Sequence, residues 1–372
     1  MKNFKICITF LIIGLIVFSF GGCNGESKTS GDMPKGEESI KVVDCAGREV
    51  EIGSNVEKIV DLTTVDGVRT LIELEAEEFI VGISNKSHQM FNSKGASGKN
   101  YIIVSQAAPE LKDISNVGDI KEPNIEMIMS LKPDVIFIDS FAKNSAEDIQ
   151  RQTNIPVVCV GSYGSFNYEM FTMLGKIVGK EERANELVEF TKNKVELVTN
   201  ITNKIPEDKR KSLFYWSHPF AGNAPKTNGN YEAFQLAGGK NVAGEGDVIP
   251  KGVYEVTKEQ IVAWDPEFIF LHSPFKEDFE GWRSVDDVKE DEVIKGTKAV
   301  AKGNVYALKG ELGGWDIATE VTEVFYIAKI LYPQEFQNLD VEKEGDEILK
   351  RFYGIDGLYT DMSEKIKLYQ WK

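Results

Sequence analysis

The chain of 372 residues contains two copies of one short sequence plan, and this internal repeat constrains the fold most strongly. The copies span residues 124–138 and 257–271. In each, a glutamate, Glu126 or Glu259, stands seven residues before a proline, which is followed by an acidic residue and an apolar run. Proline disfavours helix at the residue before it, and a short apolar run is typical of a strand buried on both faces of a parallel sheet. Each copy therefore predicts a helix followed by a buried strand.

The repeat predicts an α/β fold with two similar lobes. The two copies lie 133 residues apart. Around them, predicted strands alternate with predicted helices, which is typical of a parallel sheet covered by helices on both faces. We expect an N-terminal lobe at residues 40–165 and a C-terminal lobe at residues 206–372. A cleft between two such lobes is a natural place for a ligand.

Residues 166–205 form the most helical stretch of the sequence. Apolar residues recur among many Lys and Glu, and the next proline is Pro206. Gly175 and Gly179 divide the stretch into a short helix and a longer one that begins near Glu181. A helix of about 24 residues is about 36 Å long, which is enough to span a domain. We expect a single long helix to join the lobes.

The N-terminus has the features of a secretory signal. Two lysines precede an apolar run at residues 6–20, which is shorter than the about 20 residues that span a membrane. The run ends in Phe-Gly-Gly-Cys, which resembles the bacterial lipobox. We therefore expect residues 1–23 to be a lipoprotein signal and Cys23 to carry the lipid. An uncleaved membrane helix is the alternative. Residues 24–39 are rich in Gly, Ser, Lys and Glu and predict a flexible tether.

The net charge excludes some classes of partner, and the number of cysteines limits the possible disulfides. The formal net charge is −16, so nucleic-acid phosphates and anionic lipid headgroups repel the surface. We expect no nucleic-acid partner, membrane contact through the lipid anchor alone, and a monomer. Cys45 and Cys159 are the two cysteines left for a bridge, and their spacing does not decide whether they form one. Cys159 lies in an apolar run typical of a buried strand.

Several segments together resemble the class III substrate-binding proteins of ABC importers. Besides the lipobox, the resemblance rests on residues 41–50, 56–60, 124–136, 237–243 and 299–306. These segments agree with the family in order and spacing, and the resemblance covers residues 40–353. Members of this family bind iron–siderophores, haem, cobalamin and, in some cases, molybdate or tungstate.

The resemblance implies a fold and a partner. The fold is two Rossmann-like lobes bridged by one long helix, and the partner is a permease dimer with its ATPase subunits. One glutamate from each lobe would dock on a basic pocket of the permease, and the matching positions are Glu126 and Glu259. Alternatively, both are acids favoured in a first helical turn by about 0.3–1 kcal/mol, with Thr257 and Gln260 forming a capping box beside one of them.

Ligand-binding residues are expected in the loops at the carboxyl ends of the strands, where open α/β sheets form their crevice. Aromatic side chains there offer stacking area, and hydroxyls, amides and imidazoles fix orientation or reach a metal. The candidates are Thr63, Thr64, Asp66, Ser84, Asn85, Ser140, Phe141 and Tyr163 in the first lobe, and His218, Phe220, His272, Ser273, Trp315 and Asp316 in the second.

Several of these candidates have a structural alternative. A histidine at a strand end is more often a hydrogen-bonded structural residue than a ligand, which applies to His218 and His272. Trp315 can fill the interior of its lobe instead of facing the cleft. Asp66 and Asp316 can serve as turn or helix-cap residues, and Asp316 precedes a predicted helix.

An enzyme is the competing class of function. The sequence lacks His-Glu-x-x-His, Cys-x-x-Cys, Gly-x-Ser-x-Gly and a phosphate loop ending in Gly-Lys-Ser/Thr. We therefore predict a binding protein without an intrinsic cofactor, and keep a metal-dependent extracellular enzyme as the alternative.

The ligand expected first is metal-containing: an iron chelate, a siderophore or haem. A corrinoid, molybdate or tungstate is the alternative. Siderophore pockets of the family tend to be rich in Arg and Tyr, whereas Arg69 and Arg283 are the nearest arginines to the expected cleft. This scarcity weakens the case for a strongly anionic ferric chelate.

Overall fold

The structure is a computed structural model. It describes residues 39–93, 102–161, 166–219, 221–244, 252–272, 283–309 and 316–371. The predicted signal, Cys23 and the tether up to residue 38 lie outside these ranges. Within them, no helix combines the length and the apolar character that crossing a membrane would need.

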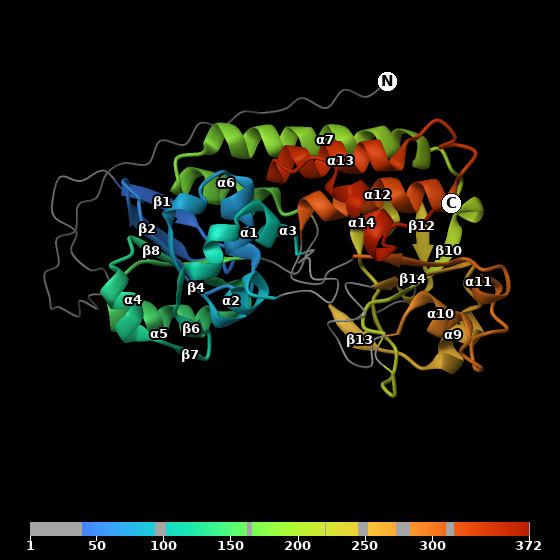
Figure 1. The fold of residues 1–372 in the computed structure, drawn as a ribbon, viewed down its shortest axis with the longest axis horizontal. Helices are drawn as coiled ribbons and strands as arrows, with labels where there is room; N and C mark the ends of the chain where they lie inside the picture. Colours follow the sequence, from blue (N-terminus) through green and yellow to red (C-terminus); the bar gives the residue numbers. More distant parts are fainter. Residues whose placement is uncertain are drawn as a thin grey trace, which may run out of the picture. The chain divides into compact units, whose positions relative to one another are not determined.

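The N-terminal lobe is built on a five-stranded parallel sheet of order β5-β4-β3-β8-β9 (Figure 1). Every residue of its strands β8 and β9 is buried, as expected for apolar strands covered on both faces. In register, Ile59 lies beside Val135, and Ile136 beside Val157. The strands are β3 (Ile59–Asp61), β4 (Ile80–Ile83), β5 (Ser115–Asn116), β8 (Val135–Asp139) and β9 (Val157–Val160).

Helices and two small hairpins surround this sheet. The helices are α1 (Asp66–Glu73), α2 (Asn85–Phe91), α3 (Ile103–Ala107), α4 (Ile125–Leu131) and α5 (Lys143–Thr153), with single turns η1 (Glu77–Phe79), η2 (Pro109–Asp113) and η3 (Ser140–Ala142). The antiparallel hairpins pair β1 (Ser39–Val43) with β2 (Glu49–Gly53) and β6 (Gly118–Asp119) with β7 (Glu122–Pro123). The first hairpin turns at residues 44–48, where the backbone N–H of Gly47 donates to the Asp44 carbonyl.

The C-terminal lobe has its own parallel sheet of four strands, of order β12-β10-β14-β15. These are β10 (Lys211–Trp216), β12 (Gly239–Asn241), β14 (Phe268–His272) and β15 (Val305–Leu308), and β11 (Lys226–Asn228) pairs antiparallel with β13 (Val253–Glu255). Its helices are α8 (Glu232–Leu236), α9 (Lys258–Trp264), α10 (Val285–Lys289), α11 (Lys298–Ala301), α12 (Ile317–Leu331), α13 (Val341–Tyr353) and α14 (Leu358–Ile366), with the turn η5 (Val242–Gly244). Two separate parallel sheets confirm the predicted bilobal α/β fold.

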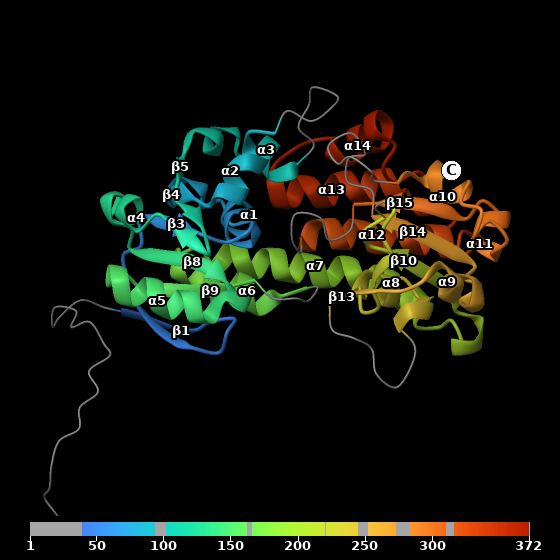
Figure 2. The same ribbon diagram turned by 90° about the horizontal axis from the view of Figure 1, so that it is seen from below.

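A short helix packed on the N-terminal lobe and then the expected single long helix lead from one lobe to the other. They are α6 (Tyr168–Ile177) and α7 (Glu181–Thr202), and the turn η4 (Glu207–Lys209) follows. The long helix α7 begins at the residue expected from the sequence. It packs against α6 at one end of its path and against α8 and α12 along the rest. Figures 1 and 2 show α7, α12 and α13 running along the same direction.

The repeat folds in the same way in both lobes. The Asn124 side chain caps α4 by accepting a hydrogen bond from a backbone N–H, and Thr257 and Gln260 form the predicted capping box on α9. Both helices end at a left-handed residue, Lys132 (φ 51°) or Asp265 (φ 46°). The next residue is proline in each copy, which cannot continue the helix, and a fully buried strand follows.

The largest hydrophobic cluster runs through both lobes. It includes Val135 and Phe137 of the N-terminal sheet, Tyr215 and Phe270 of the C-terminal sheet, and the helices that connect them. All 15 residues of α12 are buried, and its apolar residues belong to this cluster. Each sheet also has a smaller cluster on its other face.

Candidate functional site

A small hollow lies where α1, α6 and α12 approach one another. Its enclosed volume is about 10 Å³, roughly the room of one water molecule. Among the described residues, three side chains that line it are acidic and none is basic. The lining residues are Asp66, Thr70, Glu73, Gly161, Phe166, Asn167, Met170, Phe171, Ile317 and Glu320.

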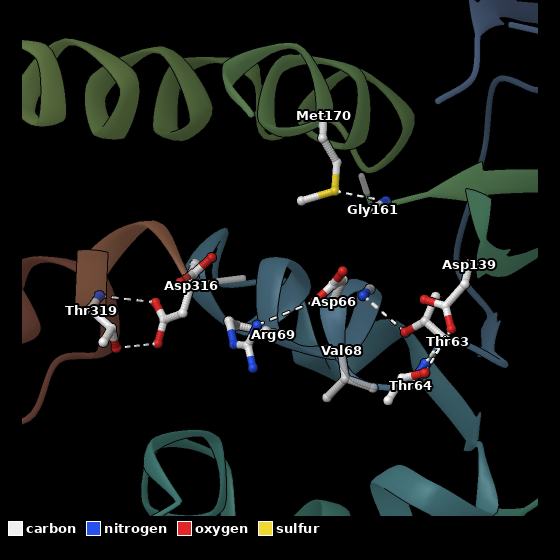
Figure 3. Close-up of polar contacts among 12 residues, drawn as sticks. Thr63, Thr64, Asp66, Val68, Arg69, Asp139, Gly161, Met170, Asp316 and Thr319 are labelled. Carbon is white, nitrogen blue, oxygen red and sulfur yellow. Dashed lines mark hydrogen bonds and ion pairs between the residues drawn. The ribbon is translucent and has the colours of Figure 1, made fainter. Parts of the chain in front are cut away.

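Two buried carboxylates hold the loop between β3 and α1, the helix that supplies three of the residues lining the hollow. Asp61 accepts hydrogen bonds from the backbone N–H of Thr63 (3.2 Å) and Val68 (2.9 Å) and from the Thr63 hydroxyl (2.9 Å). Asp139 accepts from the backbone N–H and the hydroxyl of Thr64, at 2.9 and 2.8 Å. These bonds fix the start of α1 (Figure 3).

Asp66 begins α1 and lines the hollow. Its Oδ1 lies 3.3 Å from the Arg69 guanidinium, and Figure 3 shows Arg69 between Asp66 and Asp316. A Cβ at Gly161, where φ is +76°, would lie 2.6 Å from Asp66 Oδ2, so glycine is required there. Burial raises the pKa of Asp66 to about 7, although the charge of Arg69 opposes the shift. Asp66 therefore changes charge near neutral pH.

A second polar network joins α1 to α12 and α13. The Tyr353 hydroxyl lies 2.6 Å from Glu73 Oε1 and 3.1 Å from Asp316 Oδ1. Asp316 Oδ2 accepts hydrogen bonds from Lys309 Nζ (3.1 Å) and from the Thr319 hydroxyl (2.6 Å). The network therefore crosses from the N-terminal lobe to the C-terminal lobe beside the hollow.

The two acids of this network differ in charge. Burial raises the pKa of Glu73 to about 8, and the charge of Asp316 adds to the shift. Burial acts against ionisation of Asp316, yet Lys309 and Arg69 hold its pKa well below the usual range. At neutral pH a protonated Glu73 can donate to the Tyr353 oxygen while the Tyr353 hydroxyl donates to Asp316. The Tyr353 hydroxyl thus links Glu73 of the N-terminal lobe to Asp316 of the C-terminal lobe.

Four predicted ligand residues have side chains engaged in internal hydrogen bonds. Those of Thr63 and Thr64 go to the buried acids of their loop. The Ser84 hydroxyl donates to the Thr63 carbonyl (2.7 Å) and accepts from the Ser87 backbone N–H (3.1 Å) as the cap of α2. Asp316 caps α12, which confirms its expected structural role. Ligand contact by these four residues stays a prediction.

The remaining candidates of the first lobe lie elsewhere on the loops. The Asn85 side chain donates to Asp119 Oδ2 (3.3 Å) and accepts from the Asn116 amide (3.1 Å). Ser140 is partly buried, and the Phe141 side chain is exposed. None of the three lines the hollow.

The structure brings together the two predicted histidines of the second lobe. Their ring centroids are 6.2 Å apart, and Ser217 Oγ lies 3.0 Å from His218 Nδ1. Burial lowers the pKa of both histidines, and for His272 the neighbouring His218 lowers it further. Both rings are therefore neutral at pH 7. The described residues contain no group of three His, Cys, Asp or Glu arranged to hold a metal.

Some predicted residues cannot be placed. Outside the described residues lie Cys23, Tyr163, Phe220, Ser273 and Trp315. The two cysteines that the structure does describe, Cys45 and Cys159, are free thiols. Cys159 is buried within its strand, as expected, and burial raises its pKa to about 12.

Glu126 and Glu259 are exposed in the first turns of α4 and α9. Within the described part of the chain, neither takes part in an ion pair or a side-chain hydrogen bond. Lys258, beside Glu259, pairs instead with Asp291 at 2.6 Å. Both carboxylates are therefore accessible to a partner.

Sequence reasoning missed the helical part of the hollow because it considered strand-end loops alone. Thr70 and Glu73 follow Asp66 by four and seven residues, which places all three on one face of α1. Polar residues at this spacing in a helix with many apolar residues could have indicated that α1 itself lines a polar site. Ile317 and Glu320 similarly follow the cap residue of α12.

Comparisons with known proteins agree with this architecture. The family model described as "Periplasmic binding protein" matches residues 62–312. The molybdate-binding protein MolA of Haemophilus influenzae is 26% identical over 341 residues, which cover 84% of this chain and 90% of that protein. The Fe(3+)-citrate-binding protein YfmC of Bacillus subtilis is 27% identical, covering 52% of this chain and 59% of that protein.

The fold also matches solved structures. A periplasmic solute binding protein from Veillonella parvula superposes with a TM-score of 0.71 at 19% identity, covering 89% of this chain and 98% of that one.

Proposed function

Because this chain belongs to the periplasmic binding protein family, we propose that it captures a metal-containing solute outside the cytoplasm and passes it to an ABC importer. The observation that carries the proposal is the fold of two lobes, each with its own parallel sheet, which meet at the hollow lined by α1, α6 and α12; the hollow itself has room for about one water molecule and marks the place where the lobes would admit a ligand. A protein of this family binds its ligand and releases it unchanged, so we infer no catalytic role.

We propose an iron chelate as the first ligand class, which the similarity to the Fe(3+)-citrate-binding protein YfmC supports. Asp66 and Glu320 offer oxygen atoms at the hollow, while Phe166 and Phe171 offer apolar surface to an organic chelator. The acidic side chains of the lining disfavour any anionic ligand, a bare oxyanion and an anionic ferric chelate alike. The similarity to MolA over most of both chains nevertheless makes molybdate the second candidate.

A titration distinguishes these ligands. Purified residues 24–372 would be titrated with ferric citrate, a ferric siderophore, haem, cobalamin, molybdate and tungstate, with binding followed by tryptophan fluorescence and calorimetry. We expect binding of an iron complex that Asp66→Asn weakens about tenfold, a change of about 1.4 kcal/mol. Binding of molybdate alone would replace the iron assignment, and binding of none of them would contradict the ligand class.

Delivery would depend on the two exposed glutamates. We expect Glu126→Lys together with Glu259→Lys to abolish uptake in cells, because both charges that face basic pockets are reversed. The same double variant should keep its affinity for the ligand, since neither residue lines the hollow. Uptake that survives the double reversal would contradict docking through these residues.

The proposed location is the outer surface of the cell membrane, with Cys23 carrying the lipid. Cys23→Ser should leave ligand affinity unchanged and move the protein from the membrane fraction to the soluble extracytoplasmic fraction. Retention of the variant in the membrane would contradict the lipid anchor.

A further inference from the structure

The two helices of the repeat share more than their glutamates. Counting from each glutamate, the second residue, Ile128 or Ile261, is fully buried and fixes its helix on the sheet. The third residue, Met129 or Val262, is exposed by 51% or 43%. Residues three apart lie on the same helix face. Each helix therefore presents a carboxylate and an apolar side chain as neighbours.

These apolar side chains are concentrated on the repeat helices. In the described part of the chain, eight large hydrophobic residues are exposed, and three of them lie on α4 and α9, which have seven residues each. The eight are Val43, Met127, Met129, Phe141, Leu197, Val253, Val262 and Val293. Single exposed hydrophobic residues are common, but the same position on two duplicated helices calls for a shared cause.

The chemistry of these surfaces defines a partner. The glutamates are accessible, while the basic residues near α9 are already neutralised: Lys258 pairs with Asp291, and Lys298 with Asp265 at 3.0 Å. A fitting partner surface offers a cation next to an apolar socket. Since the chain presents this arrangement twice, the partner should present it twice as well.

We propose that Met129 and Val262 are the apolar halves of two matched docking patches, Glu126 with Met129 and Glu259 with Val262, which bind the two subunits of the permease dimer. This inference rests on the proposed function and extends it. The glutamates supply charge complementarity, which mainly governs orientation and the association rate, while burial of the apolar side chains slows dissociation.

The test measures binding to the cognate permease with its ATPase subunits, held in lipid nanodiscs, by biolayer interferometry. The variant Met129→Ser with Val262→Ser removes both apolar groups and leaves the glutamates in place. Leu197→Ser is the matched control, because Leu197 is 55% exposed on α7, away from both patches. Thermal unfolding followed by circular dichroism verifies that all variants are folded.

We expect the Met129→Ser/Val262→Ser variant to bind at least about tenfold more weakly, chiefly through faster dissociation, and Leu197→Ser to bind like the wild type. If the double serine variant binds within about twofold of the wild type while Glu126→Lys/Glu259→Lys does not bind, the inference is overturned and the proposed function stands. If the charge reversal also leaves binding intact, the proposed docking itself fails. Analytical ultracentrifugation gives a further check. If the wild type is a dimer and the double serine variant is a monomer, these surfaces bind a second copy of the chain and the inference is overturned.

Discussion

The two lobes place different chemistry at the same position of their sheets. Asp139 ends β8 and His272 ends β14, at matching positions of the repeat. Each reaches the loop after the neighbouring strand: Asp139 bonds to Thr64, and His272 lies beside His218. The N-terminal lobe therefore fixes its loop with carboxylates, whereas the C-terminal lobe has two neutral imidazoles there. The same fold thus places acidic side chains at the end of β8 and imidazoles at the end of β14.

The difference also reverses the effect of pH. Burial raises the pKa of Asp61 to about 7, so its contribution to stability is lost as pH rises from 3.8 to about 7. Burial and His218 lower the pKa of His272, so its contribution is lost as pH falls below 6.5. The contribution of Asp61 to stability therefore decreases as pH rises, whereas that of His272 decreases as pH falls.

The largest effect should come from removing an acid of the N-terminal lobe. Asp61→Ala leaves three buried donors without their acceptor and should lower the free energy of unfolding by about 3–5 kcal/mol. Urea denaturation measures the change. Asp148→Ala, which removes an exposed acid, should stay within about 0.5 kcal/mol of the wild type. Equal losses in the two variants would refute the role given to Asp61.

Replacing the buried histidine should remove the loss of stability that the C-terminal lobe suffers at low pH. Below pH 6.5 the imidazole binds a proton in the unfolded chain but stays neutral when it is buried. The free energy of unfolding therefore falls by about 1.36 kcal/mol per pH unit, or up to about 2 kcal/mol between pH 6.5 and 5.0. His272→Leu should remove this loss, as measured by urea denaturation at both pH values.

The matched variant in the other lobe, Asp61→Asn, should change the pH dependence of stability in the opposite direction. Its stability relative to the wild type should rise as pH increases from 4 to 7, because the amide does not ionise. An unchanged pH slope in both variants would mean that these strand ends do not set the pH response.

The contact between the lobes should have a smaller effect. Tyr353→Phe removes the hydroxyl between Glu73 and Asp316 and should cost about 1–1.5 kcal/mol. It should also speed hydrogen exchange in α1, which belongs to the other lobe. Tyr332→Phe is the control, since the Tyr332 hydroxyl donates to Gly238 within the C-terminal lobe. Faster exchange of α1 in both variants would argue against a specific link through Tyr353.

The smallest effect concerns the helix caps of the repeat. Asn124→Ala should cost about 1 kcal/mol because α4 loses its side-chain cap. Thr257→Ala should cost a few tenths of a kcal/mol less, because Gln260 still accepts a hydrogen bond from the backbone N–H of residue 257. Thermal unfolding compares them. A larger loss in the Thr257 variant would show that the two bonds of the capping box depend on each other.

Sequence patterns predicted the fold more fully than the site. Apolar runs and prolines fixed the strands and helix ends of the repeat, because such local signals do not depend on distant residues. The hollow depends on residues far apart in the chain, such as Asp66, Gly161 and Glu320, whose proximity comes from packing between α1, α6 and α12. The link between Glu73 and Tyr353 spans 280 residues and leaves no local pattern.

The hydrophobic cluster shared by both sheets has a consequence for how the protein comes apart. Neither half can lose its structure while the other keeps a dry interior, since this one cluster contains residues of both sheets. Heating should therefore produce a single cooperative melting transition, and proteolytic fragments of either half should not persist.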